Sequence, residues 1–144
     1  MKTKNAIDAG LSVMLCIGEQ LADRQAGTTM AVCSEQLDAV KAVLKAGDWK
    51  KVVVAYEPVW AIGTGVTATP PQAQETHLNI REWLRKNISD TVANETRIIY
   101  GGSATAQNCS DLYAQPDING FLVGGASLGG AFVNIINCTH LVSK

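Results

Sequence analysis

The sequence predicts a parallel α/β fold, and three features of its pattern indicate this class. Short apolar runs that are typical of buried strands recur at residues 11–17, 51–56, 97–100 and 120–123. Each run precedes a stretch that is compatible with a helix. The length of 144 residues allows one ordinary domain. Four successive strand–helix units favour a parallel sheet with right-handed crossovers.

The first unit joins an apolar run to an amphipathic helix. Residues 11–17 are almost wholly apolar and lie between Gly10 and Gly18, so we expect a strand that is buried on both faces. From Thr28, a candidate N-cap, apolar side chains recur at steps of three and four until Gly47. This stripe predicts a helix that packs on the sheet.

The remaining units repeat this alternation. Residues 51–56 predict a strand, and Thr69-Pro70 opens a predicted helix that runs to about Asn87. The runs at 97–100 and 120–123 end in paired glycines and precede predicted helices at residues 107–114 and 132–137.

The number of units limits the architecture. Such units fit either a doubly wound open sheet or part of a (β/α)8 barrel. A whole barrel takes about 250 residues and eight units, so this chain has room for only half of one. For a partial barrel we expect a single partial domain over residues 1–144, with exposed sheet edges and an exposed apolar inner face.

Composition excludes several functional classes. The sequence has 12 Lys and Arg against 13 Asp and Glu, a net charge of -1, which argues against a nucleic-acid partner. Hydrophobic residues make up 47%, as in a globular protein. No apolar run approaches the roughly 18 residues that a membrane span needs, and no apolar signal segment opens the sequence. We therefore expect no membrane association and a cytosolic location.

The cysteines and histidines do not suggest a metal site. The four cysteines form no C-x-x-C pair, and no histidine lies at metal-ligand spacing, so we expect reduced thiols and no metal. A free cysteine is usually a small buried side chain, although Cys16 and Cys138 are candidates for redox sensitivity. We expect His77 on the surface of a helix and His140 in a disordered tail.

The second predicted strand ends at a candidate base. Reactive groups collect at the carboxyl ends of parallel strands, and Glu57 stands directly after residues 51–56. A carboxylate that apolar neighbours shield can serve as a general base, whereas the alternative is a solvated charge at a strand end. The following residues 58–68 have a Pro-Val-Trp entry, a Gly-Thr-Gly centre and a small-residue exit. This composition favours a lid with two hinges, and it also fits a long surface loop.

Two glycine pairs suggest a phosphate site. Residues 101–103 (Gly-Gly-Ser) and 124–127 (Gly-Gly-Ala-Ser) follow the third and fourth runs and offer unobstructed backbone N–H groups. Each pair alone fits a tight turn. Together, at successive strand ends, they could hold a phosphate.

Residues 55–65, AYEPVWAIGTG, closely resemble the signature of the triosephosphate isomerase family. The similarity covers nearly the whole chain: residues 16–19, 100–103 and 120–128 resemble the ends of that family's fifth, seventh and eighth strands. The chain thus resembles the second half of a TIM barrel, strands five to eight, and we expect a fragment of such a barrel.

The resemblance implies an isomerase of glycolysis and gluconeogenesis that needs no cofactor. Glu57 would move a proton between adjacent carbons of dihydroxyacetone phosphate and glyceraldehyde 3-phosphate. The family's phosphate contacts would fall on Gly63, Ser103, Gly124 and Gly125. The implied first hinge is Pro58, Val59 and Trp60, and the implied second hinge is Val66, Thr67 and Ala68. The lid residues between them are Ala61, Ile62, Thr64 and Gly65, together with Gly63. Tyr100 would hold the closed lid, and the family forms homodimers.

The sequence also departs from the family's pattern. The family's substrate-binding Asn and Lys and its electrophilic His belong to the barrel half that this chain does not match. Val66 replaces the usual Lys of the second hinge, and Gly129-Gly130 replace the usual Lys-Pro.

These departures lead to an expectation and leave alternatives open. We expect the chain to be inactive alone and to form a dimer, an aggregate or a loosely packed state. The alternatives are a non-catalytic half-barrel that binds phosphate or mediates assembly, and another phosphate-binding barrel enzyme. The second of these explains the glycine pairs but not residues 57–65.

Overall fold

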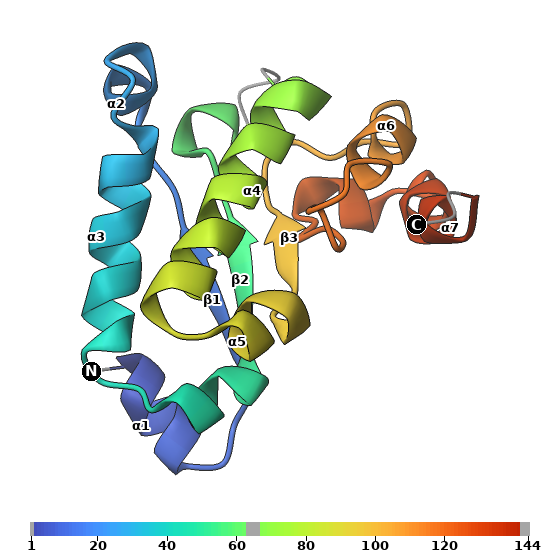
Figure 1. The fold of residues 1–144 in the computed structure, drawn as a ribbon. Helices are drawn as coiled ribbons and strands as arrows, with labels where there is room; N and C mark the ends of the chain where they lie inside the picture. Colours follow the sequence, from blue (N-terminus) through green and yellow to red (C-terminus); the bar gives the residue numbers. More distant parts are fainter. Residues whose placement is uncertain (1, 63–66, 142–144) are drawn as a thin grey trace.

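The structure is a computed structural model, and it describes residues 2–62 and 67–141 (Figure 1). Its strands are β1 (Val13–Ile17), β2 (Val52–Tyr56) and β3 (Ile98–Tyr100). Its α-helices are α1 (Lys2–Asp8), α2 (Leu21–Gln25), α3 (Thr29–Lys41), α4 (Pro70–Asn87), α5 (Asp90–Glu95), α6 (Cys109–Tyr113) and α7 (Phe132–Leu141). Three short 3₁₀ helices are η1 (Ala46–Lys51), η2 (Val59–Ala61) and η3 (Gly125–Leu128).

The strands form one parallel sheet in the order β1-β2-β3. Val13 pairs with Val52, and Tyr56 pairs with Tyr100, so the carboxyl ends of all three strands meet at one edge. The prediction of a parallel α/β fold is confirmed, and each of the first three expected strands is present within two residues of its expected start.

The fourth expected strand, residues 120–123, is not formed. Tyr100 N–H donates to the Gly120 carbonyl and Leu122 N–H donates to the Tyr100 carbonyl, both at 3.0 Å. These bonds make an isolated parallel bridge between Tyr100 and Phe121. β3 has only three residues, and in the described ranges no strand pairs with the far edge of this segment. The segment therefore starts a parallel ladder with β3 but does not extend it.

The two faces of the sheet differ in their cover. The helices α3 and α4 pack over one face, as Figure 1 shows, and the fully buried side chains there include Leu37, Val54, Ile80 and Ile98. On the other face of β1, Met14 is 50% exposed and Cys16 is also exposed. The expectation that the first strand is buried on both faces is thus wrong, because no element of the described chain covers this side of β1. An exposed inner face is what a partial barrel predicts.

The helix signals in the sequence were reliable where a cap was present. Thr69 Oγ1 accepts a hydrogen bond from Gln72 N–H at 3.4 Å, and Gln72 Oε1 accepts one from Thr69 N–H at 3.0 Å, so α4 begins where predicted. Thr28 precedes α3, but its hydroxyl donates to the Asp23 carbonyl instead of capping that helix. His140 lies exposed in the last turn of α7, not in a disordered tail.

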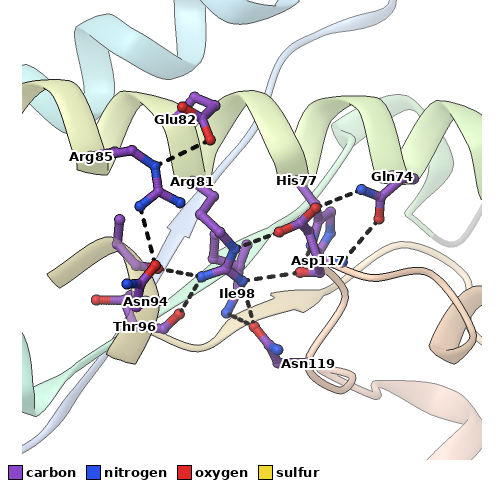
Figure 2. Close-up of polar contacts among 11 residues, drawn as sticks. Gln74, His77, Arg81, Glu82, Arg85, Asn94, Thr96, Ile98, Asp117 and Asn119 are labelled. Atoms are coloured by element: carbon purple, nitrogen blue, oxygen red, sulfur yellow. Dashed lines mark hydrogen bonds and ion pairs between the residues drawn. The ribbon is translucent and has the colours of Figure 1, made fainter. Parts of the chain in front are cut away.

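A partly buried polar cluster connects α4 to the segment that leads into the isolated bridge (Figure 2). Arg81 Nε lies 2.5 Å from Asp117 Oδ1, and Arg81 also donates to the carbonyls of Ala93 and Thr96 and to Asn119 Oδ1. The Asn119 side chain accepts a further bond from the N–H of Ile98 in β3. These bonds fix residues 117–119 against both α4 and β3.

His77 is part of this cluster, and the expectation that it lies on the helix surface is wrong. Its side chain has no exposed area. Nδ1 lies 3.2 Å from the Asp117 carbonyl oxygen. The ring also makes an edge contact with the ring of Tyr56, with 5.7 Å between the two ring centroids. The ring is therefore a packing element between α4 and the sheet.

Across the part of the chain that the structure describes, no helix has the combined length and apolar character that a membrane span requires.

Candidate active site

Several of the predicted site residues meet at a cavity of about 620 Å³ at the carboxyl ends of β2 and β3. Glu57, Ser103, Gly124 and Gly125 all line this cavity. The structure therefore brings the candidate base to the same cavity as both glycine loops. A second cavity of about 490 Å³ lies beside η1 and α5, at the opposite ends of the strands, and contains none of the predicted residues.

Close backbone packing fixes the position of Glu57. Its N–H donates to the Ile17 carbonyl at 2.7 Å, which extends the pairing of β1 and β2. A Cβ atom at Gly18 would lie 1.8 Å from the Glu57 carbonyl oxygen, and one at Gly101 would lie 2.4 Å from Glu57 Cγ. Glycine at these two positions therefore lets the backbone of Glu57 pack closely on Gly18 and its side chain pack closely on Gly101.

Cys16 lies beside Glu57 on the neighbouring strand. Partial burial raises the pKa of the Cys16 thiol to about 11, and the hydrogen bond and negative charge of Glu57 add to this effect. The thiol is therefore protonated at neutral pH, next to the candidate base.

A buried carboxylate, Glu19, holds the expected first hinge. Glu19 has no exposed area, and its Oε1 accepts hydrogen bonds from Trp60 Nε1 and Tyr56 Oη, both at 3.0 Å. Its backbone carbonyl accepts a bond from Val59 N–H at 3.1 Å. Burial, followed by the charge of Glu19, raises the pKa of Tyr56 above its usual range. The η2 helix, which contains Val59 and Trp60 of the expected first hinge, is thus bound to the loop after β1.

The second hinge contacts Tyr100. The Ala68 N–H donates to Tyr100 Oη at 3.3 Å, and burial raises the pKa of this tyrosine. A Cβ atom at Gly102 would lie 2.1 Å from Tyr100 Oη, so the glycine also keeps the space that the hydroxyl occupies. Thr67 is exposed and Ala68 is buried. Four expected lid residues lie outside the described residues: Gly63, Thr64, Gly65 and Val66.

The two glycine loops are built differently. Ser103 Oγ donates to the Ala61 carbonyl at 2.6 Å, which joins the first loop to the hinge. Gly124 and Gly125 are exposed, and an added Cβ atom at either would meet nothing within 4 Å. The Ser127 hydroxyl donates to the Gly124 carbonyl at 2.7 Å and closes η3. Chemically, the cavity combines one carboxylate with two lengths of glycine backbone, which suits a small anionic substrate that must lose a proton.

The sequence motifs did not identify two of the side chains that support this site. Glu19 was part of a recognised motif, yet nothing in the sequence paired it with Trp60. Gln36 accepts a hydrogen bond from Gly18 N–H at 2.9 Å and donates one to the Gly18 carbonyl at 3.0 Å. It lies in the middle of α3, 18 residues from its partner, where periodicity gives no signal for such a bond.

Comparison with known proteins matches this geometry. The family model described as triosephosphate isomerase matches residues 1–139. A curated triosephosphate isomerase of Paracoccidioides lutzii is 60% identical over 136 residues, which are 94% of this chain and 55% of that protein. One of Coprinopsis cinerea is 60% identical over 137 residues, or 95% of this chain and 55% of the relative. One of Taenia solium is 58% identical over 137 residues, or 94% and 55%.

The chain thus spans about half the length of the curated relatives it matches. An identity near 60% over almost the whole chain agrees with the family model and with the parallel sheet of a partial barrel. The chain belongs to the triosephosphate isomerase family.

Proposed function

We propose that the chain supplies the base, the lid and the phosphate site of a triosephosphate isomerase, which interconverts dihydroxyacetone phosphate and D-glyceraldehyde 3-phosphate. The observation that carries this proposal is the cavity of about 620 Å³ that Glu57 shares with Ser103, Gly124 and Gly125. The named relatives support the same reaction.

The proposed mechanism gives each wall of the cavity one task. The glycine backbone near Ser103 and residues 124–125 holds the phosphate through N–H groups, with Gly63 of the lid as the fourth phosphate contact. Glu57 removes a proton from the carbon beside the carbonyl and returns it to the neighbouring carbon. A general base typically contributes about 100-fold to 10,000-fold to such a step.

The lid in this proposal comprises residues 58–68 and closes over the cavity. The Trp60–Glu19 bond is the anchor of the first hinge, and Tyr100 holds the second hinge through the N–H of Ala68. A closed lid excludes water, which would otherwise protonate the carbanion-like intermediate.

We propose that activity requires barrel segments beyond this single partial domain. The chain spans about half of its relatives' length, and the uncovered face of β1, with Met14 and Cys16 exposed, supports self-association of an incomplete barrel. A half-barrel that only binds phosphate or mediates assembly is the second candidate. The same uncovered face favours it, because an exposed apolar surface is a site of protein contact.

The test is isomerase turnover with and without the barrel half that this chain does not match. The chain is mixed with the part of the Paracoccidioides lutzii protein that it does not cover, and Glu57→Gln is prepared in parallel. We expect turnover only in the mixture, and a loss of at least about 100-fold for Glu57→Gln. Glu75→Gln, which changes an exposed carboxylate on α4, is the matched control and should retain activity.

Two outcomes would contradict the proposal. A folded mixture in which wild type and Glu57→Gln are equally inactive would favour the assembly module. Equal activity in both would remove Glu57 from the role of base. Sedimentation of the chain alone tests self-association, and a sharply melting monomer would contradict it.

A cytosolic location completes the proposal. All four cysteines are free thiols, as in most cytosolic proteins, and fractionation of the producing cells would test it.

A further inference from the structure

Two cysteines meet in a small core of their own. Cys109 is the first residue of α6 and Cys138 lies in α7, and each is only 1% exposed. Together with Ile135 they form a cluster that is separate from the main core. Neither Cys16 nor Cys33 belongs to this cluster.

The hydrogen bonds place the two thiols side by side. Cys109 Sγ lies 3.9 Å from the carbonyl oxygen of Asn134 in α7. In an α-helix this carbonyl faces the N–H of the residue four positions later, which is Cys138. Burial raises the pKa of Cys138 to about 11, and a hydrogen bond with Cys109 adds to this effect.

The helix α7 is loosely packed, so local opening can expose these sulfur atoms to a reagent. Val133 is 56% exposed and Ile136 is 50% exposed, so one side of the helix has no cover in the described chain. Among its described side chains only Ile135 and Cys138 are buried. A helix with so few buried contacts opens locally more easily than a core strand does.

We propose that Cys109 and Cys138 form an oxidisable dithiol site, which a low-molecular-weight disulfide such as oxidised glutathione converts into an intramolecular disulfide between α6 and α7. One of the two thiols attacks the reagent disulfide as its thiolate, a mixed disulfide forms, and one glutathione thiolate leaves. The thiolate of the other cysteine then attacks the protein sulfur of the mixed disulfide, and the second glutathione leaves as a thiolate. Two protein thiols are oxidised, one glutathione disulfide is reduced to two thiols, and the two protons that the protein thiols lose are taken up by the leaving thiolates or by buffer.

The disulfide would connect the two glycine loops. Asn108, which precedes Cys109, donates a hydrogen bond from Nδ2 to the Ser103 carbonyl at 3.0 Å. On the other side, η3 leads into α7 through Gly129 and Gly130. Oxidation would therefore restrain segment 103–109, which follows the first glycine loop, relative to segment 129–138, which follows the second. This effect does not depend on what the two loops bind.

The test is disulfide mapping of the native chain after incubation with oxidised glutathione. The remaining thiols are blocked in denaturant, and a protease that cuts before aspartate cleaves at Asp111 and Asp117, between the two cysteines. We expect fragments 90–110 and 117–144 to be recovered as one linked species that separates on reduction. Two of the four thiols should be lost in this step, besides any glutathione adduct on the exposed Cys16.

Matched variants sharpen the result. Cys33→Ser should leave the link intact, whereas Cys138→Ser should abolish it. Recovery of both fragments with blocked thiols, a mixed disulfide that never resolves, or a link between two chains on a non-reducing gel would each overturn the proposal. The wild-type map alone gives this decision if Cys138→Ser fails to fold.

Discussion

The sheet region (residues 13–100) and the C-terminal region (residues 124–141) are held together in different ways. In the sheet region, α3 and α4 cover parallel strands, and Leu37, Val54 and Ile80 have no exposed area. In the C-terminal region, Leu128 is 91% exposed, and only Ile135 and Cys138 are buried among the described side chains. The sheet region has its own hydrophobic core. The helix α7 has the residue pattern of a helix that packs on a sheet, but in the described chain no paired strands lie beneath it.

This difference shows where the site obtains its rigidity. Glu57 stands on the sheet region, where its carbonyl group packs closely on Gly18 and its Cγ on Gly101. Gly124 and Gly125 stand on the C-terminal region, where an added Cβ atom at either would meet nothing within 4 Å. The proposed base is thus preorganised by this chain, and the proposed phosphate contacts depend on additional support.

The largest expected loss of stability comes from removing the side-chain contacts that connect the sheet region to residues 117–119, which precede the C-terminal region. Arg81 joins α4 to Asp117 and Asn119, and the side chains of Arg81 and Asp117 are only 11% and 13% exposed (Figure 2). Arg81→Ala would leave a largely buried carboxylate without its cation, so we expect a loss of roughly 3 kcal/mol in the free energy of unfolding. Denaturant titration measures this loss.

Arg85→Ala is the matched control, because within the described residues Arg85 pairs only with the exposed carboxylates of Glu82 and Asp90 and with Asn94. Such surface pairs contribute little, so this variant should unfold close to wild type. Equal losses in the two variants would show that Arg81 does not connect the two parts.

A glycine comparison tests the difference in rigidity directly. Gly18→Ala places a Cβ atom 1.8 Å from the Glu57 carbonyl oxygen, and the backbone must move, so we expect a loss of about 1–3 kcal/mol. Gly125 is the first residue of η3, a position that alanine tolerates, and its Cβ would meet nothing within 4 Å. Gly125→Ala should therefore change stability by less than about 0.5 kcal/mol. A larger loss for Gly125→Ala than for Gly18→Ala in the same denaturation series would reverse the comparison.

The smallest expected effect is chemical and concerns Cys16. Its pKa is raised from 9.0 to about 11, so below that pH its rate of alkylation should rise roughly tenfold per pH unit with the thiolate fraction. Glu57→Gln removes a negative charge that disfavours the thiolate. It should lower the pKa of Cys16 and speed alkylation several-fold at pH 8, although burial, the larger cause, stays.

Iodoacetamide labelling followed by mass spectrometry measures this rate. Cys33 is the internal control, because it is buried in the main core and should react only on unfolding. An unchanged rate for Cys16 in Glu57→Gln would mean that the two side chains do not interact.

The sequence predicted the parts of the fold that local patterns determine. The long helix α4 has a cap at Thr69, and the first three strands are continuous apolar runs, so their bounds follow from residues close in sequence. The helices α1, α2 and α5 have seven residues or fewer, which is too short for a clear apolar period. The expected strand at 120–123 failed because a strand needs partners, and pairing on one side only is not a local property.

His77 shows a signal that was present and misread. Ala73, His77, Ile80 and Leu84 follow one another at steps of three and four, so the helical period already placed the histidine on the buried stripe. Its polarity suggested the surface, and the Asp117 carbonyl resolves that conflict by bonding to the ring.

As with the fold, the sequence predicted the parts of the candidate site that local patterns determine. Glu57 and the glycine pairs follow strand ends, where a parallel sheet collects reactive groups. Glu19 and Gln36 reach partners 41 and 18 residues away, and no spacing rule connects such residues. Supporting contacts of this kind require the folded chain.

The register of the sheet also determines when the chain can fold. Val13 pairs with Val52 and Val54 pairs with Ile98, so each strand must wait for roughly 40 further residues before its partner exists. Contacts of such long sequence separation form slowly, because loop closure precedes the gain from pairing. During synthesis, β1 therefore leaves the ribosome as an unpaired apolar segment, and its exposure in that interval is a direct consequence of the parallel register.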